Sequence, residues 1–131
     1  MQLPTLLSIT PIYIALLGLL FIAFTLRAGL YRVQSKILIG TGDDPEMLRR
    51  IRGQGNFVET VPIALLLLVA IELLGAKDMW LHVLGIALVI GRICHYVAIT
   101  EIGPSVCRPI GMISTLLTIL ISSLWILINA L

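Results

Sequence analysis

Residues 45–74 read PEMLRRIRGQGNFVETVPIALLLLVAIELL, an arginine-rich third followed by a nearly unbroken apolar run. Asp44, Pro45 and Glu46 form a typical helix start, because aspartate accepts from free backbone N–H groups and proline suits the first turn. Gly75 is a typical stop. Such a helix would extend about 45 Å, about half as long again as the hydrocarbon core of a membrane. The stretch therefore predicts a spanning helix whose first third stands among the headgroups or beyond them.

Three more apolar segments flank this helix, and about 20 residues suffice for a span. Hydrophobic residues make up 59% of the 131 residues and charged residues only 12%. A soluble domain carries about 25% charged residues, so this composition excludes a disordered chain and argues against a soluble enzyme. We expect an all-α membrane protein, a four-transmembrane-helix bundle forming one domain over residues 1–131. Its helices are predicted at about 5–26, 45–74, 79–100 and 106–129.

Two helix starts need separate mention. The first apolar segment has no basic residue before Arg27 and is longer than the apolar part of a secretion signal, so we expect a retained helix. Arg108 precedes proline, and a residue before proline disfavours the α conformation. Pro109 is therefore an alternative start for the last helix. Arg108 lies at the first turn in either case.

Basic residues gather on one side of this bundle. Four spans place both termini and loop 75–78 on one side, and segments 27–44 and 101–105 on the other. Only Lys77 lies on the first side, and the second holds Arg27, Arg32, Lys36, Arg49, Arg50, Arg52 and Arg108. The positive-inside rule then predicts that loops 27–44 and 101–105 are cytoplasmic and that both termini lie on the opposite side. We expect a multi-pass protein of the inner membrane. Membrane lipids are the expected surroundings.

Other partner classes receive no support. The net charge is only +2, and the basic residues do not alternate with aromatics, so we expect no nucleic-acid partner. Cys94 and Cys107 form no CxxC pair, which predicts neither a disulfide framework nor a metal site.

Polar residues inside the spans form two stripes. Ionisable groups there are costly and are by default functional or paired. Arg49, Arg52, Asn56 and Glu59 share an arc of about 80° on the second helix, at about 100° per residue. Arg92, His95 and Tyr96 form a similarly narrow arc on the third helix, and Arg108 joins from the fourth. We expect the stripes to converge on one pocket in the cytoplasmic half.

The residue types in these stripes indicate a ligand of mixed charge. Arginines bind carboxylates or phosphates in bidentate geometry, and a buried glutamate binds an ammonium or a guanidinium. A ligand with separate carboxylates and an ammonium would satisfy the set. The alternative is structural: Glu59 pairs with Arg52 or Arg92 and holds the bundle together.

Residues 49–62, RRIRGQGNFVETVP, resemble the second-helix signature R-x-x-R-x-x-x-N-x-x-E-x-x-P of the MAPEG family, the membrane-associated proteins in eicosanoid and glutathione metabolism. Segments 72–75, 91–95 and 108–112 are similar to the bacterial branch of that family. The resemblance covers about residues 26–115. It implies a homotrimer that binds glutathione between subunits near the cytoplasmic face. It also implies transferase, peroxidase or isomerase chemistry on lipophilic small-molecule substrates.

The resemblance also assigns roles by position. Arg52 would bind a glutathione carboxylate, Glu59 the ammonium and Asn56 the peptide backbone. Arg108 matches the arginine that activates the thiol, and a cation at a helix N-terminus lowers a thiol pKa. His95 would orient the tripeptide.

Three arginines keep two interpretations each. Arg49 would bind a second carboxylate or face headgroups. Arg92 would bind the ligand or pair with Glu59. Arg32, or Arg27 in its place, would reach the glycine carboxylate or a lipid headgroup.

Two departures narrow the expected activity. The eicosanoid-forming enzymes of the family carry a tyrosine where this chain has Ile99, and one branch carries an arginine where it has Gly55. We therefore favour a glutathione transferase, with peroxidase activity as a further option, over a leukotriene or prostaglandin synthase. The main alternative is a non-catalytic glutathione- or lipid-binding protein. A small multidrug-type transporter is disfavoured, because its coupling carboxylate lies in the first helix and residues 5–26 hold no charge.

Two further patterns have structural interpretations. The small residues Gly111, Thr115, Thr118 and Ser122 form a stripe that predicts close helix packing. Glu72 and His82 lie near loop 75–78 and are predicted to pair across it.

Overall fold

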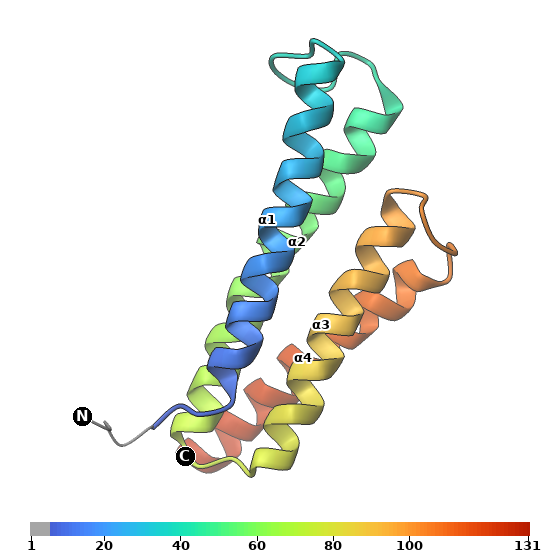
Figure 1. Ribbon diagram of the computed structural model, residues 1–131. Coiled ribbons are helices and arrows are strands. Elements are labelled where there is room, and N and C mark those ends of the chain that lie inside the picture. Colours follow the sequence, from blue (N-terminus) through green and yellow to red (C-terminus); the bar gives the residue numbers. More distant parts are fainter. Residues whose placement is uncertain (1–5) are drawn as a thin grey trace, which may run out of the picture.

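The computed structural model describes residues 6–131, which form four α-helices and no strand (Figure 1). The helices are α1 (Thr10–Gln34), α2 (Pro45–Leu73), α3 (Asp78–Ile99) and α4 (Cys107–Ala130). Each is long and apolar enough to cross a membrane. The prediction of an all-α chain with four possible spans is confirmed.

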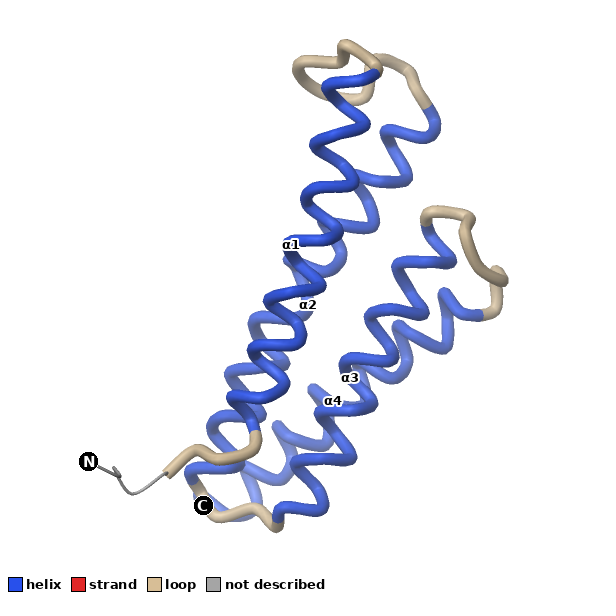
Figure 2. The backbone as a smooth tube through the Cα atoms, viewed as in Figure 1, coloured by secondary structure: helices blue, strands red, loops and turns tan. Residues whose placement is uncertain are grey.

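The four helices pack as two hairpins, α1 with α2 and α3 with α4 (Figure 2). Helices α2 and α3 each contact all three other helices, so together they form the centre of the bundle. The start of α1, the end of α4 and loop 74–77 lie at one end, and loops 35–44 and 100–106 lie towards the other (Figure 1). The α1–α2 hairpin reaches further in that second direction than the α3–α4 hairpin.

The first helix does not have the predicted bounds of 5–26. Residue 5 lies outside the described residues, and α1 begins at Thr10, with Pro11 in its first turn. A residue of α2 determines where α1 starts. The Glu72 carboxylate accepts hydrogen bonds from the backbone N–H groups of Ser8, Ile9 and Thr10 at 2.6, 2.8 and 2.7 Å. A carboxylate at a helix N-terminus satisfies free donors and complements the helix dipole.

The predicted pair of Glu72 with His82 is therefore wrong. His82 instead bonds to Tyr13 of α1, with 2.8 Å between its Nδ1 and the tyrosine hydroxyl. Glu72 faces the free N–H groups of α1, and His82 faces the buried hydroxyl of Tyr13. Both residues thus join α1 to its neighbours.

Helix α1 also ends later than predicted, at Gln34 rather than at residue 26. Charge does not end a helix, and arginine is a good helix former. Helix α2 supports this extension: Arg50 Nη1 donates to the Arg27 carbonyl at 3.0 Å, and its guanidinium lies 4.4 Å from the Tyr31 ring centroid. The chain turns only at Lys36, where φ is +57°.

Asp44 caps α2 as predicted, accepting from the backbone of Glu46 at 2.8 Å and of Met47 at 3.2 Å. The Tyr31 hydroxyl also donates to this carboxylate. This hydrogen bond is the main reason why the pKa of Asp44 lies below its usual range. A lowered carboxyl pKa stabilises the fold at neutral pH, and this contribution is lost as the pH falls through the folded-state pKa.

The other three helices begin and end within one residue of the predicted bounds. Helix α4 begins at Cys107, so the alternative start at Pro109 is wrong and Arg108 lies in the first turn. The buried residues of α4 are Gly111, Thr115, Thr118 and Ser122, which confirms the predicted packing stripe.

Substituting Gly111 should destabilise the α3–α4 contact. A Cβ atom at this position would clash with the Gly91 carbonyl oxygen and lie 2.7 Å from the His95 backbone nitrogen. Overpacking of this kind costs about 1–3 kcal/mol. We expect Gly111→Ala to lower the free energy of unfolding in detergent micelles by that amount. Gly29→Ala is the matched control, because a Cβ there meets nothing within 4 Å. Equal stabilities of the two variants would contradict this packing.

Candidate functional site

A cavity of about 390 Å³ lies between α2, α3 and α4. We call it the arginine cavity. Arg52 and Asn56 reach it from α2, His95 from α3 and Arg108 from the first turn of α4. Aliphatic side chains complete its lining: Ile99, Pro109 and Met112. Four of the candidate residues therefore meet at one place, in the half of the bundle nearest loop 100–106. The volume is typical of sites for small ligands.

Two residues of this site carry a buried polar atom without a hydrogen-bond partner. Among the described residues, five buried side-chain polar atoms lack a hydrogen bond: Asn56 Oδ1, Arg92 Nε, His95 Nδ1, Tyr96 Oη and Ser122 Oγ. Asn56 and His95 line the arginine cavity. An unsatisfied buried group costs about 1–3 kcal/mol.

The charge around the cavity is positive. Within residues 6–131, Arg52, Arg92 and Arg108 form no ion pair. Arg92 is only 1% exposed, and its Nη1 donates to the Thr60 hydroxyl at 2.9 Å. Arg52 and Arg108, which line the cavity, are exposed, and their unpaired charges favour an anionic ligand.

A second cavity of about 430 Å³ adjoins the first and shares Arg52, Ile99 and Arg108 with it. We call it the rim cavity. Arg49 lines it and is ion-paired to Glu46 at 3.3 Å and to Glu101 at 3.5 Å. Arg49 is therefore held by carboxylates of the chain itself, an arrangement that neither sequence interpretation described. A ligand carboxylate would compete for it.

Three candidate residues line neither cavity: Arg92, Glu59 and Arg32. Glu59 is exposed on α2, does not line either cavity and forms no salt bridge with described residues. The alternative in which it pairs with Arg52 or Arg92 is therefore wrong for the single chain. Arg32 donates to the Ile37 and Gly40 carbonyls at 3.2 and 2.9 Å. Arg32 thus holds loop 35–44 against the end of α1, because the backbone carbonyls that follow the helix lie within reach of its guanidinium.

The polar residues of the stripe on α3 do not all reach the arginine cavity. Tyr96 stacks on Phe24 of α1, with ring centroids 3.6 Å apart, and lies beneath Arg27. Gly53 permits this packing, since a Cβ there would lie 2.9 Å from the Tyr96 ring. The ring therefore packs towards α1, while His95 lines the arginine cavity.

Sequence reasoning missed Thr60. Its hydroxyl donates to the Asn56 carbonyl at 2.8 Å and accepts from Arg92, so it joins the two stripes. The signal was available, since residues four apart share a helix face and Thr60 follows Asn56 at that spacing. Ile99 lines both cavities. The position at which the eicosanoid-forming enzymes carry a tyrosine therefore lies at the site, and here its side chain is aliphatic.

Comparisons with known proteins agree with the resemblance. The model of the MAPEG family matches residues 10–128. The inner membrane protein YecN, from two strains of Escherichia coli, is 35% identical over 88 residues, covering 67% of each chain. No solved structure matches this chain.

Proposed function

Because this chain belongs to the MAPEG family, we propose that it is an integral-membrane, glutathione-dependent transferase for lipophilic electrophiles. The observation that carries the proposal is the arginine cavity, where Arg52, Asn56, His95 and Arg108 converge from three helices. Glutathione is the co-substrate, because its two carboxylates and amide groups match unpaired guanidinium and amide groups.

Each site residue has a part in binding. Arg52 holds a carboxylate, and Asn56 and His95, which line the cavity, orient the peptide. Arg92 contributes by ordering Asn56 through Thr60. Arg108 lies beside the thiol, at the positive N-terminus of α4, which has no side-chain cap.

The proposed chemistry follows from thiolate formation. Arg108 and the helix terminus stabilise the thiolate, and the thiol proton passes to water in the open cavity. The thiolate sulfur attacks the electrophilic carbon, a C–S bond forms, and the leaving group departs with its electron pair. The same thiolate would also reduce hydroperoxides.

The exposed charge of Glu59 favours a homotrimer. An unpaired carboxylate on the face of a spanning helix is costly in lipid. A second copy that covers α2 would shield it and turn it towards the ammonium of a ligand bound at the subunit interface. The basic ends of the helices support a site at the cytoplasmic face of the inner membrane.

Glutathione binding tests the proposal directly. Titration calorimetry on the protein in detergent micelles should detect glutathione. The same tripeptide with alanine in place of cysteine should still bind, about fourfold more weakly at pH 7, because it forms no thiolate. Ultraviolet difference absorbance should detect a thiolate with glutathione but not with the alanine analogue. With glutathione the protein should also release chloride from an activated aryl chloride. Binding without thiolate or turnover would favour the non-catalytic glutathione-binding protein. The absence of glutathione binding would overturn the site.

Replacing Glu101 should strengthen ligand binding. Its carboxylate occupies Arg49, and its backbone stands at φ +58°, a region that favours glycine. Glu101→Gln removes the competing charge, so we expect glutathione to bind about twofold to fivefold more tightly, in line with an exposed ion pair worth up to about 1 kcal/mol. Asp78→Asn, at the other end of the bundle, should leave the affinity unchanged. Weaker binding in Glu101→Gln would show that Glu101 holds the ligand itself.

A further inference from the structure

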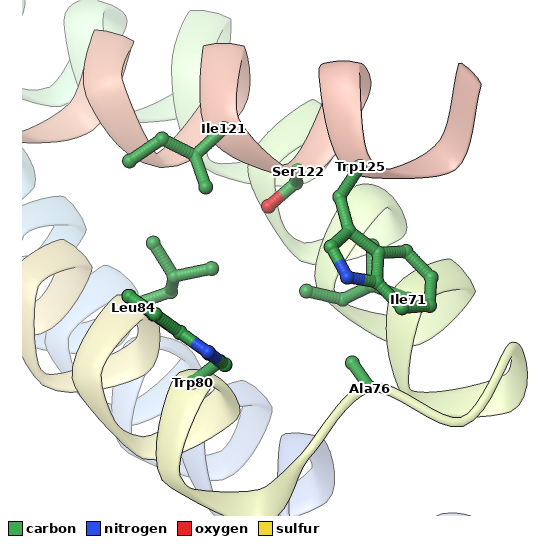
Figure 3. A pocket seen from close by; sticks show the side chains of 7 residues that line it. All are labelled: Ile71, Ala76, Trp80, Leu84, Ile121, Ser122 and Trp125. Carbon is green, nitrogen blue, oxygen red and sulfur yellow. The ribbon is translucent and has the colours of Figure 1, made fainter. Parts of the chain in front are cut away.

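The two ends of the bundle differ in the chemistry of their side chains. Near loop 74–77, a cavity of about 250 Å³ is lined mostly by apolar side chains, among them Trp80 and Trp125 (Figure 3). Towards the opposite end lie both cysteines of the chain, Cys94 on α3 and Cys107 at the first residue of α4. Neither cysteine lines the arginine cavity or the rim cavity. The two thiols are therefore nucleophiles that the proposed glutathione chemistry does not use.

The two thiols contact each other, although they stand thirteen positions apart in the sequence. A hydrogen bond joins the side chain of Cys94 to that of Cys107. Both cysteines are free and half-buried, so a small reagent can reach them. Their spacing matches no dithiol motif, because only the packing of α3 on α4 brings the two sulfurs together.

Close packing of the two helix backbones supports this contact. Gly111 lies one helical turn after Cys107 on α4. A Cβ atom there would clash with the Gly91 carbonyl oxygen and lie 2.7 Å from the backbone nitrogen of His95. His95 directly follows Cys94, so the two backbones nearly touch within about one turn of each cysteine. A disulfide needs Cα atoms about 4.4–6.8 Å apart, and such close backbone packing favours that separation.

We propose that Cys94 and Cys107 form a reversible disulfide within one chain when an organic hydroperoxide oxidises them. Ile90 and Ile110 lie about one turn from the two cysteines on the same helix faces, and both are exposed. The pair thus borders an apolar surface that faces lipid, where a lipophilic peroxide dissolves. The proposal rests on the contact between the thiols and not on the proposed glutathione chemistry.

The oxidation has two steps. The thiolate of one cysteine attacks the terminal peroxide oxygen, the O–O bond breaks, the alcohol leaves with a proton, and the sulfur becomes a sulfenic acid. The sulfur of the other cysteine then attacks the sulfenic sulfur, so that the S–S bond forms and the S–O bond breaks with release of water. The two cysteines lose two electrons and two protons, which the peroxide takes up as alcohol and water.

The reduction is thiol–disulfide exchange. A glutathione thiolate attacks one sulfur of the bridge, and the other cysteine leaves as a thiolate. A second glutathione attacks the mixed disulfide, which frees the first cysteine and gives glutathione disulfide. This end of the bundle is the one predicted to be cytoplasmic, and disulfides of a reducing compartment are usually transient and redox-sensing.

Counting thiols tests the proposal, because every disulfide within one chain must join these two cysteines. Protein in detergent micelles is treated with cumene hydroperoxide, denatured and labelled with a maleimide, and intact mass spectrometry counts the labels. We expect both cysteines to be labelled before oxidation and neither after it. The oxidised chain should lack the two thiol hydrogens and remain a monomer in a non-reducing denaturing gel. Glutathione should restore both labels.

Two variants make the experiment sensitive to geometry. Cys107→Ser leaves Cys94 without its partner, so the hydroperoxide should give a sulfenic acid that dimedone traps and no bridge within the chain. Cys94→Ser combined with Ile93→Cys keeps two thiols but turns one of them by about 100° around α3, and bridging should be lost. Circular dichroism and monodisperse elution show whether each variant folds, and the wild-type result stands without them.

Three results would overturn the proposal. Wild-type thiols that stay labelled after oxidation, or that stop at sulfenic acids, would mean that the two sulfurs do not reach bonding distance. Disulfide-linked dimers as the main product would assign the cysteines to contacts between chains. Equal bridging in the double variant would mean that loose motion of the chain, rather than the packing of α3 on α4, joins the thiols.

Discussion

Arg108→Ala should raise the pKa of the bound glutathione thiol by about 2 pH units, from about 6.5 to the value of about 8.5 for a free thiol. Such a change corresponds to about 2.7 kcal/mol of lost thiolate stabilisation. The structure supports a large effect, because Arg108 lines both cavities and stands in the first turn of α4. At pH 7 the thiolate fraction would fall about 25-fold. Turnover at saturating glutathione should fall by a similar factor.

The pH profile separates this effect from a binding defect. A lowered thiol pKa makes the wild type active from about pH 6.5 upward, whereas the variant should gain activity only as the pH rises towards about 8.5. The difference should therefore vanish above about pH 9. Arg108→Lys keeps the charge and should retain most of the effect. A thiolate band that persists in Arg108→Ala would assign activation to His95 or to the helix terminus.

Glu72→Ala should destabilise the fold by about 2–4 kcal/mol. The carboxylate accepts three backbone N–H groups at the start of α1, and a hydrogen bond to a charged group contributes about 1.5–3 kcal/mol. We take a total below the sum, because Ser8 is exposed and water can replace part of its bond. Unfolding in mixed micelles, followed by far-ultraviolet circular dichroism, measures the loss.

Two comparisons sharpen this test. Glu72→Gln keeps one acceptor oxygen and should lose about half as much stability as Glu72→Ala. Asp78→Asn changes a carboxylate at the same end of the bundle, in the first turn of α3, and should cost no more than about 1 kcal/mol. If Glu72→Ala unfolds like the wild type, water alone satisfies the start of α1.

The local determinants of the helices could be predicted from the sequence. Asp44 with Pro45 marks a helix start through hydrogen bonds that the neighbouring residues make themselves, and α2 does begin at Pro45. The small residues Gly111 and Thr115 predict close packing because nothing larger fits, and both are buried. Such features depend on residues a few positions apart.

The bounds of α1 could not be predicted, because residues distant in sequence decide them. Glu72 satisfies the N–H groups at one end, and Arg50 supports the other by bonding to Arg27. Read alone, Arg27 and Arg32 resemble the end of a span. Contact with α2 outweighs their charge, since the helix continues to Gln34.

The candidate site divides in the same way. Sequence by itself determined four possible spans, the spacing of the polar stripes on α2 and α3, and membership in the MAPEG family, since periodicity and motif spacing belong to the chain. Only the tertiary structure decided which stripe residues meet. It brought His95 to Arg52 and Arg108, packed Tyr96 against α1 and left Glu59 on the outer face. The physical reason is that a helical wheel gives the direction of a side chain, whereas the packing of the helices decides what that side chain faces.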